Sequence, residues 1–117
     1  MRCVRLAHVN VRVDRLEEAV RFYAETLGLE RLSRNDADSE RRGAWFRVGE
    51  AEVHVTEDPA PQPRSNRHFA LEVDDLDDAR RRLRAAGVEI DREETGRFFV
   101  RDPAGNRIEI ARCASER

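Results

Sequence analysis

The apolar and polar residues of this chain follow the same succession of patterns twice. Residues 7–13 alternate strictly, so that the valines share one side of an extended segment and the polar residues share the other. Alternation of this kind predicts a β-strand with one apolar face, which we place at 4–13. The same alternation returns at 67–73 and predicts an equivalent strand in the second half.

Helical periodicity follows each of these strands. Apolar residues recur at every third or fourth position over 15–27 and again over 75–86, which predicts two amphipathic helices. Asp14, with a glutamate three residues later, matches the pattern of a helix start, and we expect it to be the N-cap of the first helix. Gly28 and Gly87 stand where each predicted helix should end.

Shorter apolar stretches separated by turns complete each half. The further strands are predicted at 29–33, 43–48 and 51–57, and at 88–92, 97–101 and 107–112. Residues 34–42 predict a loop, 102–106 a turn, and the prolines of 58–66 a linker. Each half then reads β-α-β-β-β. We predict an α+β fold of two βαβββ modules, 1–57 and 67–117, whose curled sheets surround a cavity and carry the helices on their outer face.

The two halves also align in their chemistry. With an offset of sixty residues His8 falls on His68, in the first strand of each half. In the last strand His54 falls on Glu109, each between two β-branched residues. Strand parity places all four side chains on the face away from the helix. Imidazole and carboxylate suit zinc, nickel, iron, manganese or cobalt better than calcium or magnesium, so the sequence predicts a divalent transition-metal site.

Other residues share this inward face by the same parity. Asn10 and Arg12 follow His8, and we expect them to bind a substrate carbonyl or carboxylate. Trp45 and Arg47 face inward from their strand, and Phe99 does so from its own. We interpret Trp45 and Phe99 as walls of a pocket for an organic ligand, with simple cavity filling as the alternative.

Two glutamates point inward as well. Glu52 or Glu72 would serve as a general base if burial raised its pKa. The other interpretation is a salt bridge, such as one between Glu72 and Arg12.

Composition narrows the function classes. The length of 117 residues suits one domain, 1–117, and a net charge of -2 argues against nucleic acid as a partner. All 22 basic residues are arginine, which excludes Schiff-base and lysine-base mechanisms. No apolar run could span a bilayer or act as a signal peptide, so we expect a cytoplasmic protein without a membrane partner. In that compartment Cys3 and Cys113 are expected as reduced thiols, with a disulfide as the alternative.

With these residues in place, the whole chain resembles the vicinal oxygen chelate superfamily, which includes glyoxalase I, methylmalonyl-CoA epimerase, extradiol dioxygenases and the fosfomycin- and bleomycin-resistance proteins. The matching segments are 8–14, 22–23, 27–29, 68–76, 86–88 and 102–109. The last of them, Asp-Pro-x-Gly-Asn-x-x-Glu, is the most specific. The resemblance implies a metal that chelates adjacent oxygens of a small organic substrate, in isomerase, lyase or dioxygenase chemistry.

The resemblance places the metal ligands on His8, His54, His68 and Glu109, with Glu109 also the candidate base. In branches with three ligands, His8, His68 and Glu109 suffice. It also implies a homodimer whose sites are shared, with His8 and His54 of one chain facing the other two ligands on the second chain. The alternative is a metal-free binding protein of the bleomycin-resistance type, in which Trp45 would stack on an aromatic ligand together with Phe99.

The sequence also departs from named branches of the superfamily. Glyoxalase I has a glutamate at the place of His54. Fosfomycin-resistance enzymes have a lysine and a tyrosine at the places of Glu89 and Phe99, which argues against that activity here.

Overall fold

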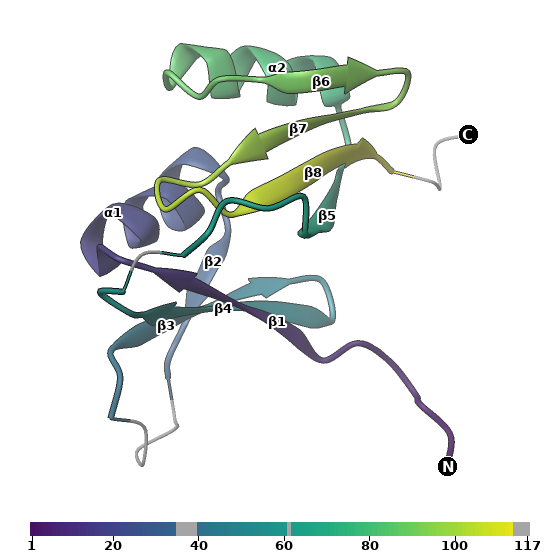
Figure 1. Cartoon of the computed structure of the whole chain (residues 1–117). Coiled ribbons are helices and arrows are strands. Elements are labelled where there is room, and N and C mark those ends of the chain that lie inside the picture. Colours follow the sequence, from purple (N-terminus) through teal and green to yellow (C-terminus); the bar gives the residue numbers. More distant parts are fainter. Residues whose placement is uncertain (35–39, 61, 114–117) are drawn as a thin grey trace. The chain divides into compact units, whose positions relative to one another are not determined.

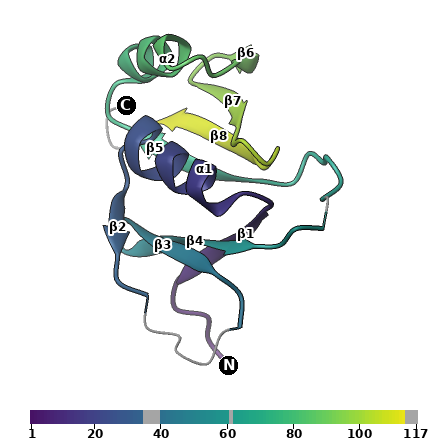
Figure 2. The ribbon, with the colours of Figure 1, turned by 90° about the vertical axis from the view of Figure 1, so that its left-hand side faces the viewer.

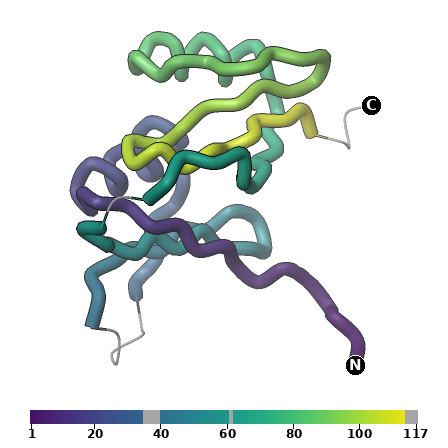
Figure 3. Tube along the Cα trace, viewed as in Figure 1, coloured from purple at the N-terminus to yellow at the C-terminus, as the bar shows by residue number. Residues whose placement is uncertain are grey.

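The computed structural model of the protein describes residues 1–34, 40–60 and 62–113 (Figure 1). The chain divides into two compact units, residues 1–62 and 63–117. Figure 3 follows the chain through each unit in turn. Residues 35–39 of the predicted loop and residue 61 of the predicted linker lie outside the described part of the chain.

The first unit is a four-stranded sheet with a helix on one face. Its elements are β1 (His8–Val13), α1 (Leu16–Arg21), the π-helical turn η1 (Phe22–Thr26), β2 (Glu30–Leu32), β3 (Gly43–Val48) and β4 (Ala51–Glu57). The strand order is β1-β4-β3-β2, with β1 parallel to β4 and the other pairs antiparallel. The helix packs on β3 and β4, as Figure 2 shows, and the ring of Tyr23 lies 5.7 Å from that of Phe46.

The second unit repeats this topology. Its elements are β5 (His68–Val73), α2 (Leu76–Ala85), β6 (Asp91–Glu94), β7 (Arg97–Arg101) and β8 (Arg107–Arg112). The strand order is β5-β8-β7-β6, with β5 parallel to β8. Because each unit reads β-α-β-β-β, the predicted α+β fold of two βαβββ modules is confirmed.

The core of each unit lies between its sheet and its helix. The largest fully buried side chains are Tyr23, Phe46, Val13 and Val55 in the first unit and Phe98, Ile108, Ile110 and Val100 in the second. Each buried apolar side chain of this size stabilises the fold by about 1.5–3 kcal/mol. The opposite face of each sheet carries the residues that alternate with these core positions, among them the candidate ligands and the aromatic residues Trp45 and Phe99.

The first helix begins differently from the prediction. Asp14 is not the N-cap; that position belongs to Arg15, whose side chain makes no capping hydrogen bond. Instead the backbone N–H of Leu16 donates to Oε2 of Glu57 on β4, at 3.1 Å. The second helix has a regular cap, since Asp75 accepts the backbone N–H three residues ahead at 3.0 Å. An arginine has no acceptor to offer the helix N-terminus, and a carboxylate from the sheet takes its place.

The ends of the helices explain why two strands begin later than predicted. The first helix widens into η1, and Leu29 N–H then donates to Tyr23 O at 2.9 Å. In the second unit Val88 N–H donates to Leu83 O at 2.9 Å. These amide groups complete the helix termini, so β2 begins at residue 30 and β6 at residue 91.

Two remaining expectations concern the start of the chain and the cysteines. The first strand begins at His8 rather than at residue 4, and residues 1–7 are exposed. The structure contains no disulfide at Cys3 or Cys113, and because the two lie in different units their reduced state stays a prediction. Of the helices in the described part of the chain, none has the length and hydrophobicity needed to cross a membrane.

Candidate functional site

The candidate ligands occupy equivalent positions in the two sheets. On the central strand of each sheet, His54 of β4 pairs with Trp45 of β3, as Glu109 of β8 pairs with Phe99 of β7. Two residues earlier on the central strand, the partner on the first strand is a histidine in both units. The register therefore equates four pairs of positions: His8 with His68, Glu52 with Arg107, His54 with Glu109, and Trp45 with Phe99.

In the first unit three aromatic rings form a stack. His54 is 8% exposed and lies between the rings of Trp45 and His8. The ring centroid of Trp45 is 4.2 Å from that of His54, with 5° between the planes. The ring of His8 lies 4.0 Å away on the other side, with 13° between the planes. The sequence predicted a common face for these residues but not the stack.

A carboxylate fixes the edge of the central ring. Nε2 of His54 lies 2.8 Å from Oε1 of Glu52, and because a carboxylate accepts only, Nε2 carries the hydrogen. This hydrogen bond lowers the pKa of Glu52 below its usual value, outweighing the opposite effect of desolvation. The condition under which Glu52 would serve as a general base, a pKa raised by burial, is therefore not met.

The stack limits how His8 and His54 can bind metal together. A metal ligand donates the lone pair of a ring nitrogen, which lies in the plane of its ring, at a distance of about 2.1 Å. The planes of these two rings are nearly parallel and meet only far from both residues. In the arrangement observed, His8 and His54 cannot ligate one ion, and one of them would have to rotate.

In the second unit a histidine and a carboxylate face each other. Nε2 of His68 lies 3.3 Å from Oε1 of Glu109. Nδ1 of His68 lies 2.9 Å from the backbone oxygen of Asn66, so Nδ1 is the donor and the lone pair of the neutral ring is on Nε2. A ring nitrogen with a free lone pair and a carboxylate oxygen 3.3 Å from it can together attract a cation. This donor set suits a divalent transition metal.

The surroundings of Glu109 are partly buried and aromatic. Its side chain is 14% exposed, and Nη1 of Arg97 lies 3.5 Å from its Oε1. The ring of Phe99 stands edge-on to that of His68, with centroids 5.1 Å apart. The other predicted wall, Trp45, lies against His54, so both aromatic residues sit beside candidate ligands. Within each unit the described residues bring together a pair of candidate ligands and no group of three or more.

The three polar residues predicted to bind substrate already have partners in the first unit. The amide of Asn10 donates to the hydroxyl of Thr56 at 3.0 Å and accepts from it at 3.2 Å. Arg12 forms an ion pair of 2.9 Å with Asp58. Arg47 is exposed and lies 3.8 Å from a glutamate of β2. A substrate would have to compete with these contacts.

A buried turn positions the strand that carries Glu109. Asp102 is 4% exposed and accepts the backbone N–H groups of Ala104 and Asn106 at 3.0 and 2.8 Å. It also accepts from the side-chain amide of Asn106 at 2.9 Å. The sequence predicted this turn but gave its aspartate no role. The specific Asp-Pro-x-Gly-Asn pattern was the available signal.

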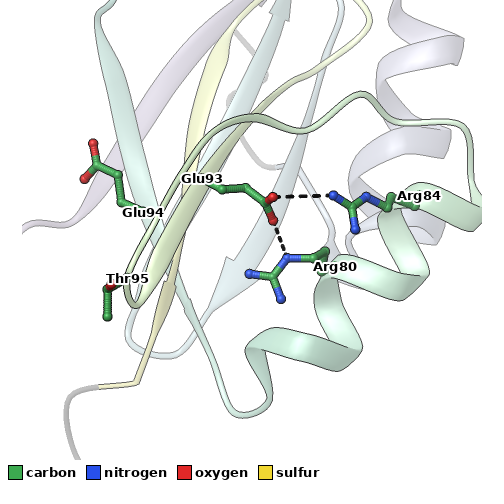
Figure 4. A pocket seen from close by; sticks show the side chains of 5 residues that line it. All are labelled: Arg80, Arg84, Glu93, Glu94 and Thr95. Atoms are coloured by element: carbon green, nitrogen blue, oxygen red, sulfur yellow. Dashed lines mark hydrogen bonds and ion pairs between the residues drawn. The ribbon is translucent and has the colours of Figure 1, made fainter.

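A hollow in the second unit is lined by Arg80, Arg84, Glu93, Glu94 and Thr95, none of which is a candidate ligand. Figure 4 shows Glu93 on β6 between Arg80 and Arg84 of α2, joined to both by ion pairs. The charges of this surface compensate one another, and we read it as the link between α2 and β6.

The family was identified by comparison with known proteins. The model of the Glyoxalase/Bleomycin resistance protein/Dioxygenase superfamily matches residues 5–110. The chain belongs to this superfamily. It is 30% identical over 115 residues to a glutathione transferase FosA of Serratia marcescens, covering 90% of this chain and 78% of that protein.

Two further proteins are similar to this superfamily member over most of its length. It is 34% identical over 124 residues to a lactoylglutathione lyase of Neisseria meningitidis, covering 92% of this chain and 89% of that protein. It also superposes on the crystal structure of a glyoxalase family protein from Bacillus anthracis with a TM-score of 0.84, at 33% identity, covering 94% of this chain and 97% of that one.

Proposed function

We propose that this glyoxalase superfamily member is a divalent-metal-dependent enzyme acting on a small organic substrate with vicinal oxygens. The observation that carries the proposal is the pair His68–Glu109, in which Asn66 fixes the tautomer that leaves Nε2 open toward the carboxylate. Such support of a histidine by a carbonyl oxygen is typical of metal ligands. Family membership and two relatives named as enzymes support the same assignment.

The proposed ligands are His8, His68 and Glu109. The four-residue prediction is narrowed because Nε2 of His54 is bound to Glu52 and its ring is stacked on His8. A bound cation of this class, zinc, nickel, iron, manganese or cobalt, would stabilise negative charge that develops on substrate oxygens. The identity of the bound metal would indicate whether isomerase or lyase chemistry, or dioxygenase chemistry, is favoured.

Glu109 is the proposed catalytic residue. Its carboxylate lies on the central strand, is largely shielded from water and can accept a proton from a substrate held against β8. Nη1 of Arg97 lies 3.5 Å from its Oε1. Phe99 and Trp45 would exclude water from the reacting groups on the two sides. One face of the Trp45 ring is already stacked on His54, and Phe99 is buried with Arg107 over its ring. Both contacts weigh against the alternative of a metal-free protein that stacks an aromatic ligand.

A complete ligand set draws on both units. His8 belongs to the first module, 1–57, whereas His68 and Glu109 belong to the second, 67–117, beyond the 58–66 linker. We propose that the set is completed in a homodimer, with His8 from one chain and the other two ligands from its partner. A closed two-fold dimer would then hold two equivalent sites.

Metal binding tests the proposal without requiring a known substrate. We expect about one equivalent of metal per wild-type chain, measured by elemental mass spectrometry and titration calorimetry. His68→Ala should weaken binding by at least about a hundredfold because it removes one of three ligands. His54→Gln is the matched control, and it should keep the stoichiometry. Stoichiometric metal in His68→Ala, or none in the wild type after reconstitution, would refute the assignment.

A mixing experiment tests where the ligand set is completed. His8→Ala and His68→Ala each lack a complete set. If sites are shared between chains, a mixed dimer regains one intact site, and an equal mixture should bind about a quarter of the wild-type metal. If each chain builds its own site, the mixture regains none.

A further inference from the structure

Arg107 is a buried cation on the face that carries the candidate ligands. It lies on β8 two residues before Glu109, directly opposite His68 on β5. The residue is 8% exposed, and its guanidinium carbon lies 3.7 Å from the centroid of the Phe99 ring. The sequence gave this position no role, although its parity with Glu109 placed it on the same face.

Arg107 lacks the polar partners that its neighbours have. Its Nε is buried, and the described residues offer it no hydrogen-bond acceptor. Arg101, its neighbour on β7, donates to the backbone oxygens of Ser65 and Gly105 at 3.1 and 2.8 Å. Arg97, on the same face, is paired with carboxylates. Of the three arginines that β7 and β8 place on this face, Arg107 is the one left with an aromatic ring alone.

A buried guanidinium without an acceptor is costly, because the charge has lost its hydration and gained little in return. The ring of Phe99 offsets part of this cost by a cation–π contact and fixes the plane of the guanidinium. It accepts none of the in-plane hydrogen bonds. Those donors form the planar fork that suits carboxylate and phosphate oxygens, so an anion would satisfy what the protein leaves open.

We propose that Arg107 binds an anionic group of the ligand, a carboxylate or a phosphate, beside His68 and Glu109. The anion site stands on the geometry of the second unit alone. Its assignment to the substrate rests on the proposed function and makes that substrate a small organic anion, with its charged group on Arg107 and its adjacent oxygens toward the ligand pair.

The first unit has no arginine at the position equivalent to Arg107. The position equivalent to Arg107 is Glu52, which has the opposite charge and is bound to His54. The repeat is therefore symmetric in the first-strand histidines, His8 and His68, and asymmetric in the residue opposite each of them. The anionic group of a ligand is therefore expected at β8, where the second unit has a cation, and not at the equivalent position of β4, where the first unit has an anion.

Metal-free protein is the material for the test. Inorganic phosphate and acetate are titrated separately, and binding is followed by calorimetry and by the arginine Nε–H signals in ¹⁵N-correlated NMR spectra. We expect the Arg107 Nε–H signal to move on saturation with one of the anions while that of Arg101 stays in place. The anion that binds tells a phosphate-type from a carboxylate-type substrate.

Variants separate a specific site from general charge. Arg107→Met should weaken anion binding at least tenfold, whereas Arg81→Met removes the same charge from the exposed face of α2 and should leave it within twofold. Arg107→Lys keeps the positive charge but lacks the planar set of donors, so its anion affinity should lie between those of the two methionine variants. This variant also provides a test if Arg107→Met does not fold.

Two results would overturn the proposal: an Arg107 signal that neither anion moves, or equal weakening by the Arg107 and Arg81 variants. Metal content is measured on separate samples of the same proteins after reconstitution with metal. Wild-type protein that takes up no metal but binds the anion would refute the proposed function and leave the anion site standing. Uptake of metal without anion binding would refute the anion site alone.

Discussion

The Asp102 turn offers a quantitative test of how the fold holds the candidate base. The perturbation is Asp102→Ala, which removes the acceptor for two backbone N–H groups and one side-chain amide. The turn directly precedes β8, and the carboxylate is 4% exposed. Its loss should destabilise the second unit and loosen the strand that carries Glu109.

The magnitude follows from the hydrogen bonds. A hydrogen bond to a charged group contributes about 1.5–3 kcal/mol net, but bonds that share one acceptor are not additive. Ala104 and Asn106 are only half-buried, so their freed N–H groups would recover part of the loss by binding water. We therefore expect a decrease of about 3 kcal/mol in the free energy of unfolding.

Two other aspartates calibrate this value. Asp75→Ala removes a single N-cap hydrogen bond and should cost about 1 kcal/mol. Asp74→Ala changes an exposed aspartate next to it and should stay within about 0.5 kcal/mol. Urea unfolding followed by circular dichroism measures all three variants. Trp45 is the sole tryptophan and lies in the first unit, so its fluorescence reports whether the units unfold together.

The order of the three losses in unfolding free energy tests this account of the turn. If Asp102→Ala costs less than Asp75→Ala, the buried turn does not hold β8, and the account of how Glu109 is positioned fails. Equal losses for the Asp102 and Asp74 variants would show that only the charge matters.

Two further predictions concern the first unit. Glu52→Gln removes a carboxylate whose pKa is lowered in the folded state, chiefly by the hydrogen bond from His54. The stability that the Glu52 carboxylate contributes is fully present above its unfolded pKa and is lost as pH falls through the lower folded value. The difference in unfolding free energy between Glu52→Gln and wild type, measured by urea unfolding, should therefore be largest near neutral pH and shrink in acid. A difference that grows in acid would contradict this. Gly43→Ala would place a Cβ 2.5 Å from the backbone oxygen of Val55, and we expect a loss of about 1–3 kcal/mol in thermal or urea unfolding. Gly28→Ala has open space but a φ of +72°, so about 1 kcal/mol is expected there, and a larger loss at Gly28 would show that backbone conformation outweighs the close contact.

The strands and their faces were the predictable part of this fold. Residues 43–48, 51–57, 97–101 and 107–112 were predicted with the bounds that the structure has. Alternation works here because one face of each sheet is buried against a helix, so a shift by one residue would bury polar groups. The same rule placed each candidate ligand of the central strands beside an inward aromatic residue.

Helix ends were less predictable because their partners come from elsewhere in the chain. The start of α1 is completed by Glu57, 41 residues away, and local sequence carries no sign of that contact. Asp14 has the right residue type one position too early, whereas in the second unit Asp75 stands at the cap itself. Pattern rules identify a residue able to cap a helix, but only the tertiary fold decides which residue does so.

The candidate site shows the same division between residue type and orientation. Repeat alignment brings His54 into correspondence with Glu109 and therefore predicts that His54 is a metal ligand. The sequence does not show in which direction the nitrogens of its ring point. In the structure Glu52, two residues before His54, takes one ring nitrogen, and the stack turns the ring face toward His8. The residue two places earlier on the central strand therefore decides the role of His54 and of Glu109. In the first unit the carboxylate of Glu52 engages His54. In the second unit Arg107 leaves Glu109 open to His68. An exchange at this position, Glu52→Arg, should therefore release Nε2 of His54, and a gain of metal affinity in that variant would show that the neighbouring residue, and not the repeat itself, selects the ligands.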